Sequence, residues 1–250
     1  MNEELITITT ENVDTESLCC IVWKKAHPGI DAKRAWLRDR LTEGHVFRKI
    51  RGDGCAFIEY APLKHAWTPI VGKNYLYIYC LWVDGVMKKH GYGKLLMESC
   101  LRDAQDNGYS GVCMLGADKQ KAWLSSQSFA AHFGFTTVDA TENGYSLLAL
   151  SFDGTTPRFS DSVKKMTIPE KELTIYYDCQ CPFIPTRIDM LRQHCLDKKI
   201  PAQFIAVDSL DMAKSLPCVF NNWAVFFGGQ FVTVNQIDRG FVERLVSGTE

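Results

Sequence analysis

The sequence predicts an α/β protein with a mixed sheet, followed by a second and smaller α/β domain. Residues 75–83 are apolar and largely aromatic without a charge, which is typical of a strand buried on both faces. An amphipathic helix over residues 95–106 follows this strand after a turn with two glycines. The polar, turn-rich residues 153–162 then interrupt the pattern before strands and helices resume.

Length and composition exclude several classes of protein. With 250 residues, 46% of them hydrophobic, the chain can bury a substantial core. The net charge of −1 argues against a nucleic-acid binder that relies on counterion release. No apolar run approaches a membrane span, and residues 1–5 do not resemble a signal peptide. We therefore expect a cytoplasmic protein with neither nucleic acid nor membrane as a partner.

The ten cysteines predict neither a disulfide framework nor a zinc site. The chain is long for a disulfide scaffold and has no secretion signal. No Cys-x-x-Cys pair occurs, and Cys179-Gln180-Cys181 is too tight for the usual ligand spacing of zinc. We expect no metal.

Strands and helices alternate through residues 1–153. The predicted strands are 5–10, 46–50, 55–60, 75–83, 111–115, 136–140 and 145–152. The predicted helices are a short one capped by residues 14–17 and running through Val22, then 32–41, 95–106 and 125–133. Residues 51–54 suit a hairpin turn, and Gly134 suits a helix C-cap.

A polar linker, residues 154–171, separates this region from a second domain at 172–250. Its predicted strands are 173–177, 202–207, 223–227 and 230–234, and its predicted helices are 187–197, 208–215 and 237–246. Gly228-Gly229 is the expected turn of the last hairpin. The order β-α-β-α-β-β-α is that of a small thioredoxin-like domain.

The turn before helix 95–106 has the features of an anion site. The first N–H groups of a helix lack intrahelical partners, and the helix dipole is positive there. Gly91 and Gly93 have no Cβ and would let a pyrophosphate approach the backbone, and Lys88, Lys89 and Lys94 add positive charge. The turn is therefore either a pyrophosphate site or a plain strand-to-helix connection.

Lys88-Lys89-His90-Gly91-Tyr92-Gly93 is similar to motif A of the GNAT superfamily of acetyl-CoA-dependent N-acetyltransferases, whose pattern is Gln/Arg-x-x-Gly-x-Gly/Ala. Gly134-Phe135 resembles the end of the family's motif B, and the resemblance covers roughly residues 1–153. It implies that acetyl-CoA is the co-substrate. It also implies which residues bind it. Backbone groups of Leu81, Trp82 and Val83 meet the pantetheine and thioester, the pyrophosphate meets the amides of the turn, and the cofactor-binding residues of that turn are Lys88, Lys89, His90, Gly91, Tyr92, Gly93 and Lys94.

Two positions depart from the family pattern. Trp123 stands where many members have an asparagine that touches CoA. Ala130 stands where many have a tyrosine that protonates the leaving thiolate. The resemblance therefore predicts CoA binding but supplies no general acid.

Glu59 and Tyr79 are the candidate catalytic residues. Glu59 lies among apolar neighbours, where burial raises the pKa of a carboxyl group toward the useful range, or else it alternates outward to water. Tyr77 and Tyr79 occupy inward positions of the central strand, but a phenol is a poor base near neutral pH. The preferred mechanism is direct attack on the thioester, with water relaying the proton to Glu59.

Five other residues are weaker candidates. A buried Cys80 would be an acyl-carrying nucleophile only in a minority mechanism. His65 and His132 are more typical of a surface loop and a helix flank. Lys119 and Lys121 either meet the 3′-phosphate of CoA or are solvated charges, and the same two alternatives hold for the lysine of motif A.

The C-terminal segment resembles a YoaP-like domain. Cys181-Pro182-Phe183 is similar to the start of a Cys-Pro-x-Cys redox turn, but Ile184 stands where the second cysteine would be. The Leu216-Pro217 bond could correspond to the cis-proline that faces such a turn. The domain has either an accessory role, in dimerisation or in covering substrate, or a thiol-sensing role through Cys179 and Cys181.

Three functions are consistent with these features. The first is an N-acetyltransferase acting on a small-molecule amine, with a homodimer as one option for the assembly. The second is a thiol-redox or sensing protein that uses Cys181 and has a CoA-binding N-terminal domain. The third is a noncatalytic acyl-CoA-binding scaffold. Tyrosine and tryptophan side chains near residues 60–79 favour a small or amphipathic acceptor if they line a pocket, and otherwise they belong to the core.

Overall fold

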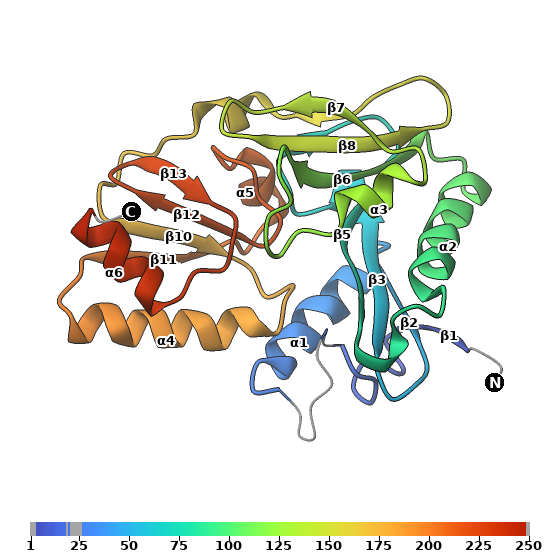
Figure 1. Ribbon diagram of the computed structural model, residues 1–250, viewed down its shortest axis with the longest axis horizontal. Helices are drawn as coiled ribbons and strands as arrows, with labels where there is room; N and C mark the ends of the chain where they lie inside the picture. The colour runs from blue at the N-terminus through green and yellow to red at the C-terminus, as the bar shows by residue number, and fades with distance from the viewer. Residues whose placement is uncertain (1–3, 19, 21–26, 249–250) are drawn as a thin grey trace. The chain divides into compact units, whose positions relative to one another are not determined.

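The computed structural model describes residues 4–18, 20 and 27–248. These residues form two compact units (Figure 1). The first consists of residues 34–66 and 70–159 together with the described residues before 27. The second consists of residues 27–33, 67–69 and 160–248.

A seven-stranded mixed sheet is the centre of the first unit. In spatial order its strands are β1 (Leu5–Thr7), β2 (Val46–Ile50), β3 (Cys55–Pro62), β5 (Tyr75–Asp84), β6 (Gly111–Ala117), β8 (Tyr145–Ser151) and β7 (Thr136–Ala140). Only β5 and β6 run parallel, and every other neighbouring pair is antiparallel. The predicted mixed sheet is confirmed.

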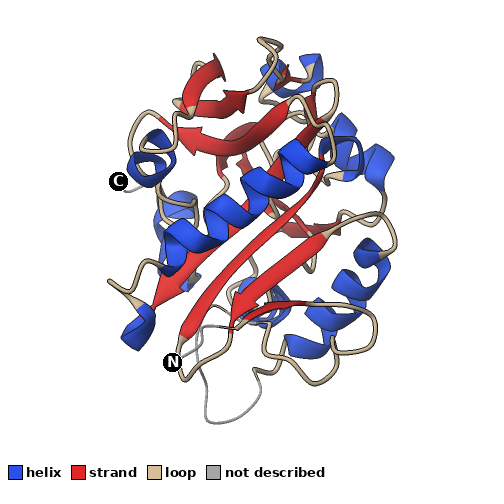
Figure 2. Cartoon of the chain, turned by 90° about the vertical axis from the view of Figure 1, so that its right-hand side faces the viewer, coloured by secondary structure: helices blue, strands red, loops and turns tan. Residues whose placement is uncertain are grey.

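Helix α2 (Tyr92–Asp106) lies over one face of this sheet (Figure 2). Its apolar side chains join a core cluster with the strands below, and Leu96, Cys100 and Ala104 are fully buried. Asp103 fixes the helix laterally, because its carboxylate accepts from Tyr60 Oη at 2.5 Å and pairs with the Arg48 guanidinium at 2.9 Å. The other helices of the unit are α3 (Gln127–Ala131) and α1 (Ile30–Leu41), which belongs to it from Arg34 on.

Strand β5 is buried only in its first half. It pairs with β6 through Tyr75–Ile78 and then continues beside β3 alone, as far as Asp84. Tyr75–Tyr79 are buried, whereas the side chains beyond are partly exposed and Trp82 is 41% exposed. The prediction of burial on both faces is therefore wrong beyond Tyr79, because the two parallel strands diverge there.

A β-bulge lies at this point of divergence. Glu59 of β3 is opposite Cys80 of β5, but the next residue, Tyr60, is opposite Ile78. Tyr79 is thus the extra residue of the bulged strand. A bulge reverses the alternation of side chains and increases the local twist, so β5 presents different faces before and after Tyr79.

The second unit holds a four-stranded sheet in the order β11-β10-β12-β13. Its strands are β10 (Leu173–Tyr177), β11 (Ala202–Ala206), β12 (Trp223–Phe227) and β13 (Gln230–Thr233), and its helices are α4 (Phe183–Asp197), α5 (Leu210–Ser215) and α6 (Arg239–Ser247). Strands β10 and β11 are parallel, and the other two pairs are antiparallel. The element order matches the predicted one, and the thioredoxin-like classification stays a prediction.

The segment predicted as an irregular linker carries regular structure. Strand β9 (Arg158–Phe159) pairs with β4 (Ile70–Val71), and a 3-10 helix covers Asp161–Lys165. Ile70 and Phe159, which face each other in this ladder, are buried. A few apolar residues inside a polar segment were enough to order it.

Helix starts were the least accurate predictions. Helix α2 begins at Tyr92 instead of residue 95, and α4 begins at Phe183 instead of residue 187, with Pro185 tolerated in its first turn. The helix expected through Val22 falls mostly on residues 19 and 21–26, outside the described residues, and residues 14–18 are not helical. The described residues contain no cis peptide bond, so a cis Leu216-Pro217 is not observed.

Candidate functional site

The connection from β5 to α2 is short and has an unusual backbone. A 3-10 turn at Gly85–Met87 follows the strand, and the chain then reaches Gly91, the N-cap of α2, which has a φ of 81°. That left-handed conformation is favourable for glycine and strained for other residues. Gly93 lies close to a neighbouring side chain, because a Cβ there would be 3.3 Å from the Phe129 ring, a tight contact.

The amides of this connection point to an anion site. The first helical hydrogen bond of α2 runs from Leu95 N to Gly91 O. Within the described part of the chain, the amides of His90, Gly91, Gly93 and Lys94 have no protein acceptor. Unpaired N–H groups at a helix N-terminus attract negative charge. The structure therefore keeps open most of the backbone donors that the sequence predicted.

The lysines here already have partners. Lys88 Nζ lies 2.7 Å from Asp84 Oδ1 and Lys94 Nζ lies 3.7 Å from Glu98 Oε1, on largely exposed side chains. The hydrogen bond from Lys88 holds the pKa of Asp84 below its usual value. Lys121 lies over the Tyr145 ring at 4.9 Å. A phosphate would therefore compete with a protein carboxylate for Lys88.

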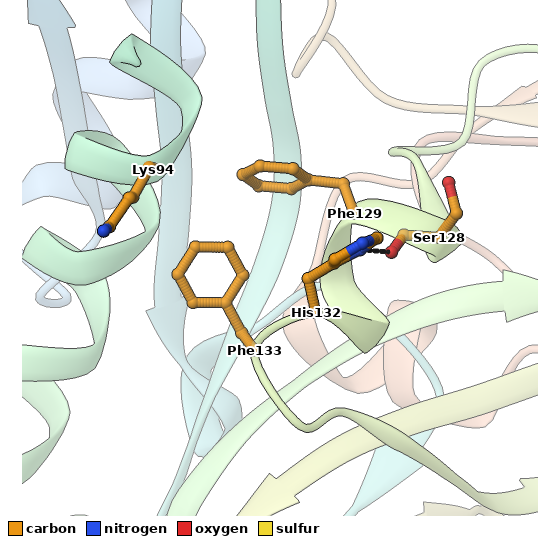
Figure 3. A pocket seen from close by; sticks show the side chains of 5 residues that line it. All are labelled: Lys94, Ser128, Phe129, His132 and Phe133. Carbon is orange, nitrogen blue, oxygen red and sulfur yellow. Dashed lines mark hydrogen bonds between the residues drawn. The ribbon is translucent and has the colours of Figure 1, made fainter.

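A cavity of about 530 Å³ lies beside the N-terminal turn of α2 (Figure 3). Lys94 of α2 lines it together with Ser128, Phe129, His132 and Phe133. The two phenyl rings lie between α3 and α2, and His132 Nδ1 is bonded to Ser128 O at 2.5 Å. The two phenylalanines were not among the candidates drawn from the sequence. Their spacing of four residues, which is typical of one helical face, was the available signal.

The exposed half of β5 is close to the loop that leads into α3. Leu81, Trp82 and Val83 lie after the bulge, where β6 no longer pairs with the strand. The Leu81 amide donates to Ser125 Oγ at 3.0 Å. One of the three backbone positions expected to meet CoA thus has a protein acceptor, the hydroxyl of a single serine.

Glu59 is buried on the other side of the bulge and is paired with His45. Its carboxylate Oε1 lies 2.8 Å from His45 Nε2, and the two side chains are only 1% and 2% exposed. The alternative that Glu59 alternates outward to water is therefore wrong. His45 was not among the residues selected from the sequence. It lies two residues before Phe47 and on the same face, and Phe47 is opposite Glu59 in the sheet.

Aromatic rings enclose this pair. The His45 ring centroid is 5.1 Å from that of Tyr79 and 5.2 Å from that of Trp36. Tyr77 contacts Tyr79 at 5.0 Å. The structure thus brings both candidate catalytic residues, Glu59 and Tyr79, into one buried cluster next to the bulge.

The remaining candidates are not part of this cluster. His65 lies in the 3-10 helix Leu63–His65, and no described contact joins it to Glu59. Ala130 is fully buried in the core, so the position of the family's tyrosine acid holds an apolar group. Cys80 is partly buried and forms no disulfide, and the described residues contain no cluster of three or more His, Cys, Asp or Glu side chains suited to a metal ion.

The Cys179 thiol of the second unit is not activated by its surroundings. Burial, and then the charge of Asp178, raise the pKa of Cys179, while Lys33 acts in the opposite direction. Cys181 packs against the core cluster of this unit, and Ile184 is buried in α4.

No helix in the described residues is long and apolar enough to cross a bilayer.

The sequence pattern of the acetyltransferase (GNAT) family matches residues 11–135, and that of the YoaP-like family matches residues 201–244. An uncharacterized N-acetyltransferase of Bacillus subtilis (strain 168), called YoaP, is 36% identical over 245 residues, which cover 97% of this chain and 98% of that protein. The chain belongs to the GNAT acetyltransferase family. Both resemblances drawn from the sequence are thereby confirmed, and the activity of this GNAT protein is N-acetyl transfer.

Solved acetyltransferases are similar to this GNAT protein over part of its length. An N-acetyltransferase from Staphylococcus aureus Mu50 has a TM-score of 0.43 at 11% identity and covers 60% of this chain and 99% of its own. A GNAT acetyltransferase from Brucella melitensis, solved in complex with acetyl-CoA, has a TM-score of 0.42 at 14% identity and covers 64% and 94%.

Proposed function

We propose that the chain transfers the acetyl group of acetyl-CoA to the amine of a small molecule, by direct attack of the amine on the thioester. One observation carries this proposal. Amides without protein acceptors, at His90, Gly91, Gly93 and Lys94, lie at the N-terminus of α2, and Lys94 also lines an open pocket of about 530 Å³. A pyrophosphate suits those donors, and its nucleotide suits the adjoining cavity.

The acyl end of the co-substrate follows β5. In this proposal the edge of β5 at Leu81, Trp82 and Val83 that faces away from β3 meets the pantetheine, since β6 no longer pairs with that edge. The bulge at Tyr79 then positions the thioester close to Glu59, which is opposite Cys80. Backbone donors aimed at a developing oxyanion stabilise the transition state without relying on a particular side chain.

The reaction needs one proton acceptor. The amine nitrogen forms a bond to the carbonyl carbon, the C–S bond breaks, and CoA leaves as a thiolate. Before this attack Glu59, which is buried beside the bulge, takes one proton of the substrate ammonium through a water molecule and so frees the lone pair of the amine. The second N–H proton is released to solvent as the C–S bond breaks. Solvent protonates the thiolate, because Ala130 offers no proton. Tyr79 helps to enclose the acceptor side.

The second unit has an accessory role in this proposal, in dimerisation or in covering the substrate. We propose residues 1–153 as the acetyltransferase domain, 154–171 as the connection and 172–250 as the accessory domain. The raised pKa of Cys179 and the core packing of Cys181 weigh against a thiol-redox function.

A matched pair of glycine variants tests the proposal. Gly91→Glu places a bulky anion in the proposed pyrophosphate site. Gly108→Glu, after the other end of α2, is the control, because Gly108 also has a positive φ and open space around its Cβ position. Calorimetry measures acetyl-CoA binding, and release of free CoA reports turnover over a panel of small amines and peptide N-termini.

We expect wild type and Gly108→Glu to bind acetyl-CoA and to acetylate a small amine, and Gly91→Glu to lose both properties. If Gly91→Glu and Gly108→Glu bind acetyl-CoA equally well, the assignment of the pyrophosphate to the turn at Gly91 is wrong. Binding without turnover over the whole panel would favour a noncatalytic scaffold, and turnover of peptides alone would overturn the small-molecule acceptor.

A further inference from the structure

We propose that His45 is a positioning residue for Glu59, and that the two side chains act as one proton-accepting pair during acetyl transfer. This inference rests on the proposed function, in which Glu59 receives the proton of the amine. It adds a residue that no motif of the sequence indicates and a prediction about the protonation state of the acceptor.

The geometry of the pair is that of a strong, buried hydrogen bond. The distance from His45 Nε2 to Glu59 Oε1 is 2.8 Å, and both side chains are almost completely excluded from solvent. A carboxylate only accepts, so Nε2 carries the hydrogen of this bond. A buried carboxylate without such a donor would be costly. His45 therefore keeps Glu59 inside the sheet and sets its orientation.

The surrounding rings fix the imidazole. Trp36 of α1 meets it edge-on at 5.2 Å, and Tyr79 of β5 lies 5.1 Å away. Tyr79 is also the bulge residue, and Tyr77 packs against its ring. Three strands and one helix thus hold the pair beside the distortion of β5 that leaves its backbone without a β6 partner.

The described contacts place one ion pair and three ionisable side chains of β5 near the two side chains. At the end of α1, Arg40 Nε and Glu43 Oε2 lie 3.0 Å apart, and the His45 amide donates to Arg40 O. On β5 the ionisable neighbours are Tyr77, Tyr79 and Cys80, the last opposite Glu59. The arginine and glutamate compensate each other, and the negative charge that the proposal uses is that of Glu59.

This arrangement has a chemical consequence. Glu59 as carboxylate and His45 as neutral imidazole together carry one negative charge. The pair attracts an acceptor that arrives as an ammonium ion and takes its proton through water, which leaves the pair without net charge until the proton passes to solvent. Activity should therefore fall as the pH falls, because a pair that is already protonated has no capacity left.

Three variants and one matched control test the pair. His45→Phe removes the hydrogen bond, whereas His45→Gln keeps an N–H donor close to the position of Nε2 but cannot take up a proton. Glu59→Gln removes the negative charge. His194→Phe is the control, because His194 lies 3.5 Å from Glu243 in the second unit and is also buried. The readouts are acetyl-CoA binding, kcat and KM as functions of pH, and 15N spectra of the histidines.

We expect every variant to bind acetyl-CoA within about 3-fold of wild type, since the pair lies away from the amides of α2. His45→Phe and Glu59→Gln should lower kcat by about 100-fold, in the range of general acid–base catalysis. His45→Gln should have a higher kcat than His45→Phe, but its kcat should not show the decrease at low pH that the wild type shows. In the wild type, the His45 spectrum should change over the pH range in which activity falls.

A wild-type kcat and pH profile in His45→Phe, with acetyl-CoA still bound, would overturn the proposal. So would a His45 spectrum that is constant over the pH range in which wild-type activity falls, and this measurement does not depend on a variant that folds. Failure of the wild type to bind acetyl-CoA or to acetylate any amine would instead contradict the proposed function.

Discussion

Gly91 and Gly93 occupy similar places in the sequence, but the structure requires them for different reasons. Gly91 has open space around its Cβ position and is needed for its φ of 81°. Gly93 has no left-handed backbone, and its constraint is the tight contact that a Cβ would make with the Phe129 ring. Single residues of the site are thus constrained by backbone conformation and close approach as well as by chemistry.

The carboxyl group of Asp153 should make the stability of the fold depend on pH in the acid range. Hydrogen bonds, first from the Thr155 hydroxyl and then from the Ser110 side chain, lower the pKa of Asp153 from 3.8 to about 2. A carboxyl group with a lowered native pKa stabilises the fold above its unfolded pKa, and this contribution is lost as the pH falls toward 2. Asp153→Asn should therefore reduce Tm at pH 6 and make little difference at pH 2.

Thermal unfolding of wild type and Asp153→Asn between pH 2 and pH 6 measures this effect. Asp14→Asn, which removes another exposed carboxylate, in this case one paired with Arg38, is a suitable control. A difference in Tm between wild type and Asp153→Asn that is constant over this range would contradict the role of the ionised carboxylate.

At the scale of elements, β5 combines two functions because it changes partners along its length. Up to Ile78 it lies between β3 and β6 and belongs to the core. Beyond the bulge at Tyr79 it pairs with β3 alone and ends next to the N-terminus of α2. The divergence of two parallel strands thus creates a free backbone edge next to an anion site.

The ion pair at the end of β5 should weaken binding of acetyl-CoA. Asp84→Asn removes the partner of Lys88 and a negative charge near the proposed pyrophosphate site. We expect the Kd for acetyl-CoA to fall by about 1.5- to 5-fold, the size of an exposed ion pair, and the gain to shrink at high salt. Calorimetry at two salt concentrations measures it, with Asp14→Asn again as the control. An unchanged or weaker affinity would exclude competition for Lys88.

The loop before α3 should compete with the co-substrate for β5. Ser125 Oγ accepts from the Leu81 amide, and Gln120 supports this loop by donating to the Lys121 and Leu124 carbonyls. Ser125→Ala should tighten binding of acetyl-CoA by about 2- to 10-fold, the worth of one hydrogen bond. Isothermal titration measures the change.

Ser126→Ala is the comparison for that prediction. It removes the neighbouring hydroxyl, which accepts from the Phe129 amide as the N-cap of α3, and should not tighten binding. Weaker binding by Ser125→Ala would mean that this serine assists the co-substrate instead of competing with it.

At the scale of the whole molecule, the two compact units do not follow the order of the chain. Residues 67–69 lie in the first half of the sequence but belong to the second unit. Trp67 is 5% exposed in a core cluster with Phe220 and Phe226, and Thr68 Oγ1 donates to Phe220 O at 2.7 Å. The second unit therefore needs a segment that a simple cut of the chain would remove.

Trp67→Ala should destabilise the second unit by about 3–5 kcal/mol, the usual cost of deleting a buried aromatic side chain. Amide hydrogen exchange in β12, which carries Phe226, measures the loss of protection in the intact protein. Trp123→Ala, at a side chain that is 44% exposed, is the control and should leave that protection unchanged. Equal protection in both variants would show that Trp67 is not part of this core.

Much of the site could be predicted because its signals are local. The glycines of the β5–α2 connection and the strand and helix around it are adjacent in sequence, so the sequence could point to amides that the structure leaves without protein acceptors. The start of α2 was not, because helical backbone begins at Tyr92, directly after the strained Gly91, three residues before the apolar periodicity begins at Leu95.

The pairing of His45 with Glu59 could not be predicted in the same way. It depends on the register of β2 against β3 and on the bulge at Tyr79, and both involve residues far apart in sequence. The Leu81–Ser125 bond spans an even longer separation. Only packing of the whole sheet selects among the registers that an alternating sequence permits.

The sequence by itself determined the α/β class, the order of strands and helices, the family and the glycine turn that is proposed to bind an anion, because periodicity, glycines and helix ends act over a few residues. Only the tertiary structure decided that β5 leaves β6 at Tyr79, that Glu59 is buried, and that His45 is its partner. Those features depend on strand register and close packing, which involve residues from the whole sheet and not only neighbours in sequence.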